Sequence, residues 1–318
     1  MNIFLPARVF AALLVLTGLT MQATAHAETT LERIKRTGVV RIGYANEAPF
    51  AFTKLDGKVS GESPQIARII FAKMGVRKVK PVLTEWGALI PGLKAKRFDV
   101  IAAGMYITPE RAKQVLFTDP HYQLKDTLLV QKGNPKNLHS YADIVKDPDL
   151  KLAIMAGTAE YQYAIDEGVR KDQILQVPNT IAQFQAVKTK RADAAVGTKL
   201  TMKDLARKSR NKLIAIDDFI DDPSHIGYGA LAFRKDDQDL RDAVNTTLHA
   251  WLGSEQHLAT VKPFGFDRSN LTDKTAAELA GQLDGAPAAE SAAESTVKPA
   301  VEPDTKPADE PAVEPSDD

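Results

Sequence analysis

An arginine at the start of an expected helix is the first residue that suggests recognition chemistry. Arg111 follows Thr108-Pro109-Glu110, in which Thr108 is placed as a helix N-cap and Pro109 as the first helical residue. A guanidinium is planar, permanently charged and able to donate two parallel hydrogen bonds, so it suits a carboxylate. The alternative is a surface arginine paired with Glu110 or Asp119. On its position in the sequence alone, Arg111 is better explained by this surface ion pair.

Three aromatic side chains and a carboxylate would form a cation site if the fold brought them together. Glu47 and Phe50 lie close together, Trp86 follows Thr84-Glu85, and Tyr106 precedes the Arg111 segment. Aromatic faces beside one carboxylate form a cage for a delocalised or bulky cation. Taken singly, each ring is better explained by core packing.

Backbone groups and hydroxyls near these residues are candidates for further ligand contacts. Gly104 and Thr108 flank the loop before Arg111 and offer a backbone group and a hydroxyl. Gly157-Thr158 precedes an expected helix, whose first N–H groups have no partner within the helix and suit an anion.

Other chemistries find little support in the composition. The chain has no cysteine, which excludes disulfides and thiolate sites, and its formal net charge is zero, which argues against nucleic acid as a partner. We therefore predict no catalytic residue, no metal site and no cofactor, although a carboxylate such as Glu47 or Glu160 could act as a base. The histidines form no metal-binding spacing; they are His26, His121, His139, His225, His249 and His257.

Strand-like and helix-like stretches alternate through the body of the chain, which predicts α/β units with mostly parallel sheets. Residues 50–60 predict a hairpin with its turn at Asp56-Gly57. Pro81 indicates either an edge position or an irregularity for the strand expected at 79–83. Further strands are expected at 38–44, 98–102, 127–131, 152–155, 174–177, 192–196 and 229–233, and helices at 30–37, 63–74, 87–95, 159–167, 180–188, 199–208 and 238–252.

The two ends of the sequence differ from its body. Arg8, the apolar run 9–20 and small residues at 23, 25 and 27 predict a cleaved signal peptide over residues 1–27, and hence a periplasmic protein. Residues 285–318 hold nine acidic residues against two lysines and almost no large apolar side chain. Such a composition predicts a disordered acidic tail rich in Pro, Ala and Glu.

The chain resembles the family 3 extracellular solute-binding proteins over about residues 30–270. The order and spacing of short segments carry this resemblance, which no single segment would support. These segments are Val40–Tyr44, Trp86–Leu93 (WGALIPGL), Arg97–Arg111 (RFDVIAAGMYITPER), Phe117–Tyr122 (FTDPHY), Gly157-Thr158 and Gly229–Arg234 (GALAFR).

The resemblance implies the two-lobe periplasmic-binding-protein fold of class II, in which two hinge strands join the lobes around a ligand cleft. Lobe 1 would comprise 29–125 plus 227–284 and lobe 2 would comprise 126–226, with crossings near 127–131 and 227–233. It also implies an arginine on the ligand carboxylate, here Arg111. The expected ligand-binding residues are Glu47, Phe50, Trp86, Gly104, Tyr106, Thr108, Arg111, Gly157 and Thr158.

One departure from the family pattern concerns the ligand cation. Amino-acid binders of the family carry a lobe 2 aspartate for the α-ammonium, and Gly197 stands at the expected position. Segments 45–50, 89–93 and 102–111 are instead similar to the members that serve ectoine/hydroxyectoine importers. That similarity implies Arg111 on the carboxylate of a cyclic zwitterion, Glu47 on its amidinium, and the three rings around it.

The expected function is therefore capture of ectoine or hydroxyectoine by a monomer that delivers it to the permease subunits of an ABC importer. Two alternatives remain open. One is a binding protein for a polar amino acid or betaine-like solute, and the other is an enzyme similar to cyclohexadienyl dehydratase, which shares the fold.

Overall fold

The computed structural model describes residues 27–281, and the expected signal peptide and acidic tail lie outside that range. The residues from 27 to 281 belong to one compact unit that contains two larger β-sheets and a short hairpin. Among them, no helix combines the length and apolar character needed to cross a membrane.

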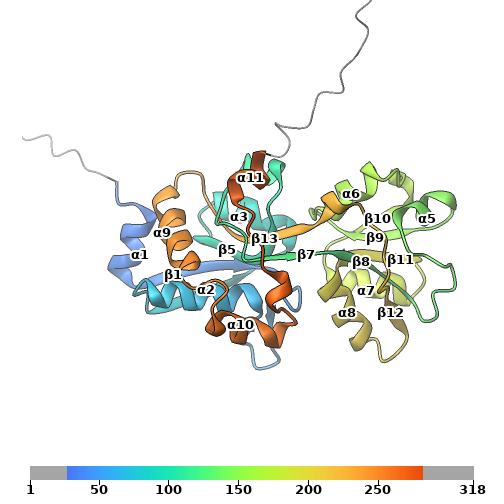
Figure 1. Cartoon of the computed structure of the whole chain (residues 1–318), viewed down its shortest axis with the longest axis horizontal. Coiled ribbons are helices and arrows are strands. Elements are labelled where there is room, and N and C mark those ends of the chain that lie inside the picture. Colours follow the sequence, from blue (N-terminus) through green and yellow to red (C-terminus); the bar gives the residue numbers. More distant parts are fainter. Residues whose placement is uncertain (1–26, 282–318) are drawn as a thin grey trace, which may run out of the picture. The chain divides into compact units, whose positions relative to one another are not determined.

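The first sheet has the order β4-β1-β5-β13-β6, with β7 also paired to β13 (Figure 1). Strand β1 pairs in parallel with both β4 and β5, whereas β13 runs antiparallel to β5, β6 and β7. The sheet is thus mixed, and the expectation of mostly parallel pairing holds only for its β4-β1-β5 half. Its strands are β1 (Val39–Tyr44), β4 (Lys78–Leu83), β5 (Val100–Tyr106), β6 (Leu116–Phe117), β7 (Tyr122–Leu124) and β13 (Gly227–Phe233).

Helices cover both faces of this sheet, because successive side chains along a strand point to opposite faces and both sets are apolar. Val100 and Ala102 of β5 face a core with α2 (Glu62–Lys73) and α9 (Gln238–His249). Ile101 and Ala103 face the opposite core, which includes Leu89 and Leu93 of α3 (Leu89–Lys94). A strand that is buried on both faces carries no polar alternation, as the fully buried β5 shows. The remaining helices near this sheet are α1 (Thr30–Thr37), η1 (Trp86–Ala88), α4 (Pro109–Ala112), α10 (Glu255–Val261), η4 (Lys262–Phe264), η5 (Arg268–Asn270) and α11 (Ala276–Gly281).

The second sheet has the order β10-β9-β11-β8-β12. Strand β9 is parallel to β10 and β11, and β8 is antiparallel to β11 and β12. Helices α5 and α6 pack on one face, and α7 and α8 on the other. The elements are β8 (Asp126–Gln131), α5 (Tyr141–Lys146), β9 (Leu152–Met155), α6 (Glu160–Asp166), η2 (Lys171–Gln173), β10 (Ile174–Val177), α7 (Thr180–Lys188), β11 (Ala194–Thr198), α8 (Lys199–Lys208), β12 (Leu213–Ala215) and η3 (Pro223–His225).

Two short passages of chain connect the sheets, as Figure 1 shows where β7 leads into β8 and where the chain enters β13. Lys125 separates β7 from β8, and Ile226 separates η3 from β13. The expected crossings at 127–131 and 227–233 are therefore strands within the sheets, and the connections precede them. The lobe boundaries at residues 126 and 226 remain a proposal, which the membership of the two sheets supports.

The hairpin expected near residues 50–60 is present as β2 (Phe52–Thr53) and β3 (Val59–Ser60). Gly57 has φ +78°, and its N–H donates to the carbonyl of Lys54, so the turn lies where Asp56-Gly57 predicts it. Strand β4, which contains Pro81, pairs only with β1 and is an edge strand of the first sheet, one of the two possibilities that Pro81 indicates. These two features position the loop that carries Glu47 and Phe50.

Candidate functional site

A small cavity of about 20 Å³ brings together most of the residues that the sequence singles out. On the first-sheet side it is lined by residues from the loop before β2, from η1, from β5 and from α4. The segment before and at the start of α6 closes the other side, together with the end of β11. The lining residues are Glu47, Phe50, Trp86, Gly104, Tyr106, Arg111, Thr158, Ala159, Glu160 and Thr198.

Two of the expected ligand-binding residues, Thr108 and Gly157, do not line the cavity. They form hydrogen bonds to residues that line it. The hydroxyl of Thr108 accepts the backbone N–H of Arg111 at 3.3 Å and so caps the single turn of α4. The carbonyl oxygen of Gly157 accepts hydrogen bonds from two side chains of the cavity wall, Trp86 and Arg111. Their contribution to a ligand site would thus be one of positioning.

Arg111 is buried, with 8% of its surface exposed, and its guanidinium forms part of the cavity wall. Nη1 donates to the carbonyl of Tyr106 at 2.8 Å, and Nη2 donates to the carbonyl of Gly157 at 3.0 Å. Its Cζ lies 5.8 Å from the centre of the Trp86 ring. Burial lowers the pKa of Arg111, and the negative charge of Glu160 acts in the opposite direction.

The alternative of a surface ion pair for Arg111 does not match this geometry. Within residues 27–281, Arg111 forms no salt bridge with a carboxylate, and Asp119 pairs instead with His249 at 2.6 Å. A buried cation that is held only by neutral carbonyls lacks the compensation that a carboxylate gives. An anionic ligand group would supply it.

Glu47 also lines the cavity and is buried, at 7% exposure. Its Oε1 accepts the hydroxyl of Thr201 at 3.1 Å, which links the loop before β2 to α8. Burial, helped by the nearby charge of Glu160, raises the pKa of Glu47 to about 8, while Thr201 and Arg111 act to lower it. Burial thus favours the protonated form of this carboxyl.

The three aromatic residues form both cavity wall and core. Phe50 is 1% exposed and packs on Tyr122 and Phe266, with ring centres 5.4 and 5.6 Å away. Tyr106 packs on Tyr122 at 6.4 Å, while Trp86 donates from Nε1 to Gly157. The core and binding interpretations of these rings are thus compatible, because one face of a ring can pack inward while another part borders the cavity.

Position 104 of β5 requires glycine, because the backbone there lies close to the side chains of Phe50 and Tyr122. Its φ is +72°, and a Cβ there would lie 2.6 Å from Cδ1 of Phe50 and 2.9 Å from the hydroxyl of Tyr122. That hydroxyl donates to the Gly104 carbonyl at 2.8 Å. Any larger residue would push Phe50 and Tyr122 away from the cavity.

Sequence reasoning did not assign Glu160, Ala159 or Thr198 to the site. Glu160 is the first residue of α6, is buried, and has its pKa raised by that burial. Behind the lining lies Asp126, 3% exposed, whose pKa burial raises strongly and whose Oδ1 receives the Tyr106 hydroxyl at 3.4 Å. The position of Glu160 directly after Gly157-Thr158-Ala159 was the one sequence signal available.

Position 197, where the family pattern led us to look for an acid, does not line the cavity. A Cβ on Gly197 would lie 2.7 Å from Cε of Met202 on α8. The next residue, Thr198, lines the cavity, and its hydroxyl accepts the N–H of Thr201. The acids that do reach the cavity, Glu47 and Glu160, come from other segments.

The site as a whole carries one buried guanidinium and an excess of buried carboxyls. Arg111 suits an anionic group, and Glu47 and Glu160 suit a cationic or hydrogen-bond-donating group at a short distance from it. Aromatic faces border the space between them. This arrangement fits a small zwitterion.

Comparison with known proteins identifies the family of the chain. A model of the bacterial extracellular solute-binding proteins, family 3, matches residues 40–262. The chain is 35% identical over 284 residues to the probable amino-acid ABC transporter periplasmic-binding protein y4tE of Sinorhizobium fredii, covering 87% of this chain and 94% of that one. It is 30% identical over 208 residues to a probable amino-acid ABC transporter-binding protein of Haemophilus influenzae, covering 65% and 78%.

Solved structures show the same similarity. EhuB in complex with hydroxyectoine superposes with a TM-score of 0.74 at 34% identity, covering 80% of this chain and 98% of EhuB. The ancestral amino acid-binding protein AncCDT-1, a precursor of cyclohexadienyl dehydratase, gives a TM-score of 0.65 at 30% identity and covers 74% and 99%. The two-lobe fold expected from the sequence is thereby confirmed.

Proposed function

The chain belongs to the bacterial extracellular solute-binding proteins of family 3, and from this premise we propose that it is the periplasmic binding component of an ABC importer whose ligand is ectoine or hydroxyectoine. The observation that carries the proposal is the cavity itself. It joins a buried guanidinium, Arg111, to a buried carboxyl, Glu47, between the rings of Phe50, Trp86 and Tyr106.

The chemistry of ectoine suits each of these groups. Its carboxylate would receive the two-pronged hydrogen bonds of Arg111, and its amidinium would lie against Glu47 and the aromatic faces. A cation next to Glu47 would also stabilise the ionised carboxylate, which burial disfavours in the structure. The hydroxyectoine complex of the similar protein EhuB adds independent support.

Binding would require the cavity to open and close again. A volume of about 20 Å³ accommodates little more than one water molecule, so a ring-shaped ligand needs the walls to separate. The hydrogen bonds from Arg111 and Trp86 to the Gly157 carbonyl would break, and the ligand carboxylate would take the place of that carbonyl on Arg111. Movement about the connections at Lys125 and Ile226 would accomplish this.

A second candidate ligand class is a polar amino acid or betaine-like solute. The extra buried carboxyl of Glu160 favours an amino acid within this class, because an α-ammonium has three N–H donors and Oε1 of Glu47 already accepts the hydroxyl of Thr201. The name of the similar Sinorhizobium fredii protein also refers to amino acids.

Isothermal titration calorimetry on the purified protein tests both candidates. The panel comprises ectoine, hydroxyectoine, glycine betaine, arginine, histidine, glutamine and glutamate. We expect enthalpy-driven binding of one ectoine per monomer, tighter than that of any amino acid. Tighter binding of an amino acid would overturn the ectoine proposal and leave solute binding intact, and heat from no compound in the panel would argue against both.

A further inference from the structure

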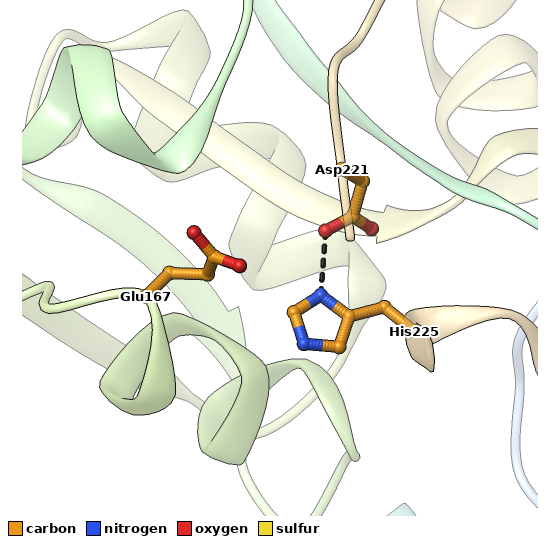
Figure 2. A group of neighbouring side chains, drawn as sticks. All are labelled: Glu167, Asp221 and His225. Carbon is orange, nitrogen blue, oxygen red and sulfur yellow. Dashed lines mark hydrogen bonds and ion pairs between the residues drawn. The ribbon is translucent and has the colours of Figure 1, made fainter. Parts of the chain in front are cut away.

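Two carboxylates and one imidazole lie close together beside the second sheet, outside the cavity that Arg111 lines. Glu167 ends α6, whereas Asp221 and His225 lie on the segment that contains η3 and leads into β13. One ligand-capable atom from each residue lies within 4.8 Å of the other two. Figure 2 shows both carboxylates directed at the edge of the His225 ring, with Nδ1 hydrogen-bonded to Oδ1 of Asp221 at 2.6 Å.

The imidazole is held in a fixed orientation. His225 is 7% exposed, and its ring stacks on Tyr163 of α6 with the centres 4.2 Å apart and the planes 14° apart. Tyr141 meets the same ring edge-on at 6.3 Å. Stacking on Tyr163 therefore fixes the plane of the ring, and this constraint would remain when a metal displaced the hydrogen bond to Asp221.

The surroundings are short of positive charge. Among residues 27–281, neither Glu167 nor Asp221 forms a salt bridge with a lysine or arginine. Oδ1 of Asp221 pairs with His225 and also accepts the backbone N–H of Asp222 at 3.0 Å. Asp221 also adds to the negative field that raises the pKa of both Asp126 and Glu160. A cation bound at this position would relieve that field.

We propose that Glu167, Asp221 and His225 form a site for a divalent transition metal of the Zn²⁺ class. The metal would replace the proton between Nδ1 of His225 and Oδ1 of Asp221, and that proton would pass to solvent. Glu167 would be the third ligand. One nitrogen and two carboxylate oxygens suit Zn²⁺, with a fourth tetrahedral position left for water, whereas Mg²⁺ favours oxygen ligands alone.

The geometry requires only a modest adjustment. Ligand atoms around a tetrahedral zinc lie roughly 3.3 Å apart, given bonds of about 2.0 Å. Nδ1 of His225 and Oδ1 of Asp221, which lie 2.6 Å apart, would separate to that distance. The exposed side chain of Glu167 would move inward, since it has no hydrogen-bond partner among the described residues. The metal would then tie the end of α6, whose first residue lines the cavity, to the segment that enters β13.

Local spacing could not reveal this group, and the sequence led us to expect no metal site. Glu167 is far from Asp221 and His225 along the chain, and an Asp four residues before a His is common. Tertiary packing brings them together, because His225 of η3 stacks on Tyr163 of α6 and meets Tyr141 of α5 edge-on.

The test uses the full mature chain, prepared without a polyhistidine tag and stripped of metal with a chelator. Calorimetric titration with Zn²⁺ is repeated on Glu167→Gln, on Asp221→Asn and on Glu255→Gln, a matched change at an exposed glutamate on α10. Co²⁺ added to the stripped protein provides a second measurement, since four-coordinate Co²⁺ absorbs visible light. Circular dichroism checks that each variant is folded.

We expect one Zn²⁺ per chain, a Co²⁺ absorption band, no binding of Mg²⁺ under the same conditions, and an unchanged affinity in Glu255→Gln. Glu167→Gln and Asp221→Asn should each weaken Zn²⁺ binding by about tenfold or more. Failure of the wild type to bind Zn²⁺, or equal binding by Glu167→Gln, would overturn the proposal. Glu167→Gln decides the matter if Asp221→Asn does not fold, because the Glu167 side chain is exposed. None of these results depends on the identity of the solute.

Discussion

Nη2 of Arg111 donates to the carbonyl oxygen of Gly157 across 3.0 Å, which joins α4 beside the first sheet to the loop after β9 of the second. The same oxygen receives Nε1 of Trp86 at 3.1 Å. Gly157 was expected to offer N–H groups to an anion, yet it is the carbonyl that faces the guanidinium. This carbonyl holds the two sides of the cavity together at the point where a ligand carboxylate would bind.

Arg111→Ala should nearly abolish binding of the zwitterionic ligand. The ligand carboxylate would lie buried without its partner, which costs about 2–5 kcal/mol. Arg111→Lys should recover part of this, because an ammonium cannot donate two parallel bonds to one carboxylate. Calorimetry on the folded variants measures both effects, and near-wild-type affinity of Arg111→Ala would place the carboxylate site elsewhere.

Arg111→Ala should also lower the stability of the ligand-free protein. The carbonyl of Tyr106 loses the Arg111 donor, whereas that of Gly157 keeps Trp86 as a donor. A buried acceptor left unpaired costs about 1–3 kcal/mol. Urea unfolding in the absence of ligand measures this change. Water reaching the space left by the side chain would make the loss smaller than that range.

Glu47→Gln should change how stability depends on pH. Folding raises the pKa of Glu47 from its ordinary 4.5 to about 8, so the folded protein holds this proton more tightly than the unfolded chain. The stabilisation is complete below about pH 4.5 and is lost as pH rises through about 8. The melting temperature of the wild type should therefore fall relative to that of Glu47→Gln as pH rises from 5 to 8.

Melting curves of both proteins, recorded without ligand across that pH range, provide the measurement. For a chain of this size, each kcal/mol corresponds to about 2–4 °C in melting temperature. Asp126 and Glu160, whose pKa values burial also raises, remain in the variant, so some pH dependence persists in both proteins. Parallel curves for the two proteins would show that Glu47 does not titrate in this range.

Gly104→Ala should destabilise the protein and disturb the cavity. The substitution adds a Cβ 2.6 Å from Phe50 and imposes a positive φ on a non-glycine residue. The two effects should together cost about 2–5 kcal/mol, from roughly 1–2 kcal/mol for the left-handed backbone and roughly 1–3 kcal/mol for overpacking. Gly57→Ala is the control, since its φ is +78° but nothing lies within 4 Å of the added Cβ.

Denaturant unfolding of the two glycine variants separates backbone strain from packing. Gly57→Ala should lose only the backbone contribution and should bind the ligand as the wild type does. Equal losses of unfolding free energy in Gly104→Ala and Gly57→Ala would mean that Phe50 moves away from the added Cβ without any cost in stability.

Trp86 variants test whether an aromatic face contributes to ligand binding. Trp86→Phe keeps a ring but removes the Nε1 donor to Gly157, and Trp86→Leu removes the ring as well. If a ligand cation lies on the aromatic wall, Trp86→Leu should bind more weakly than Trp86→Phe by about 0.5–2 kcal/mol. Equal affinities in calorimetry would leave Trp86 with the structural role of pairing with Gly157.

Local sequence patterns predicted the parts of this protein that depend on neighbouring residues. Asp56-Gly57 predicted the hairpin turn, Pro81 indicated an edge strand or an irregularity, and Thr108-Pro109 predicted the start of α4, because turn, ladder and cap preferences act within a few residues. The sequence also determined which residue types were available, with Arg111 as the cation and no cysteine anywhere in the chain.

Only the tertiary structure decided which of those residues meet. Glu160 and Thr198 join the cavity, Thr108 and Gly157 lie just behind it, and position 197 is directed at Met202, because the packing of the two sheets sets which side chains lie opposite each other. The same packing raises the pKa of Glu47, since burial is a property of the assembled fold. It also brings Glu167 to His225, a contact between distant segments that no local pattern encodes.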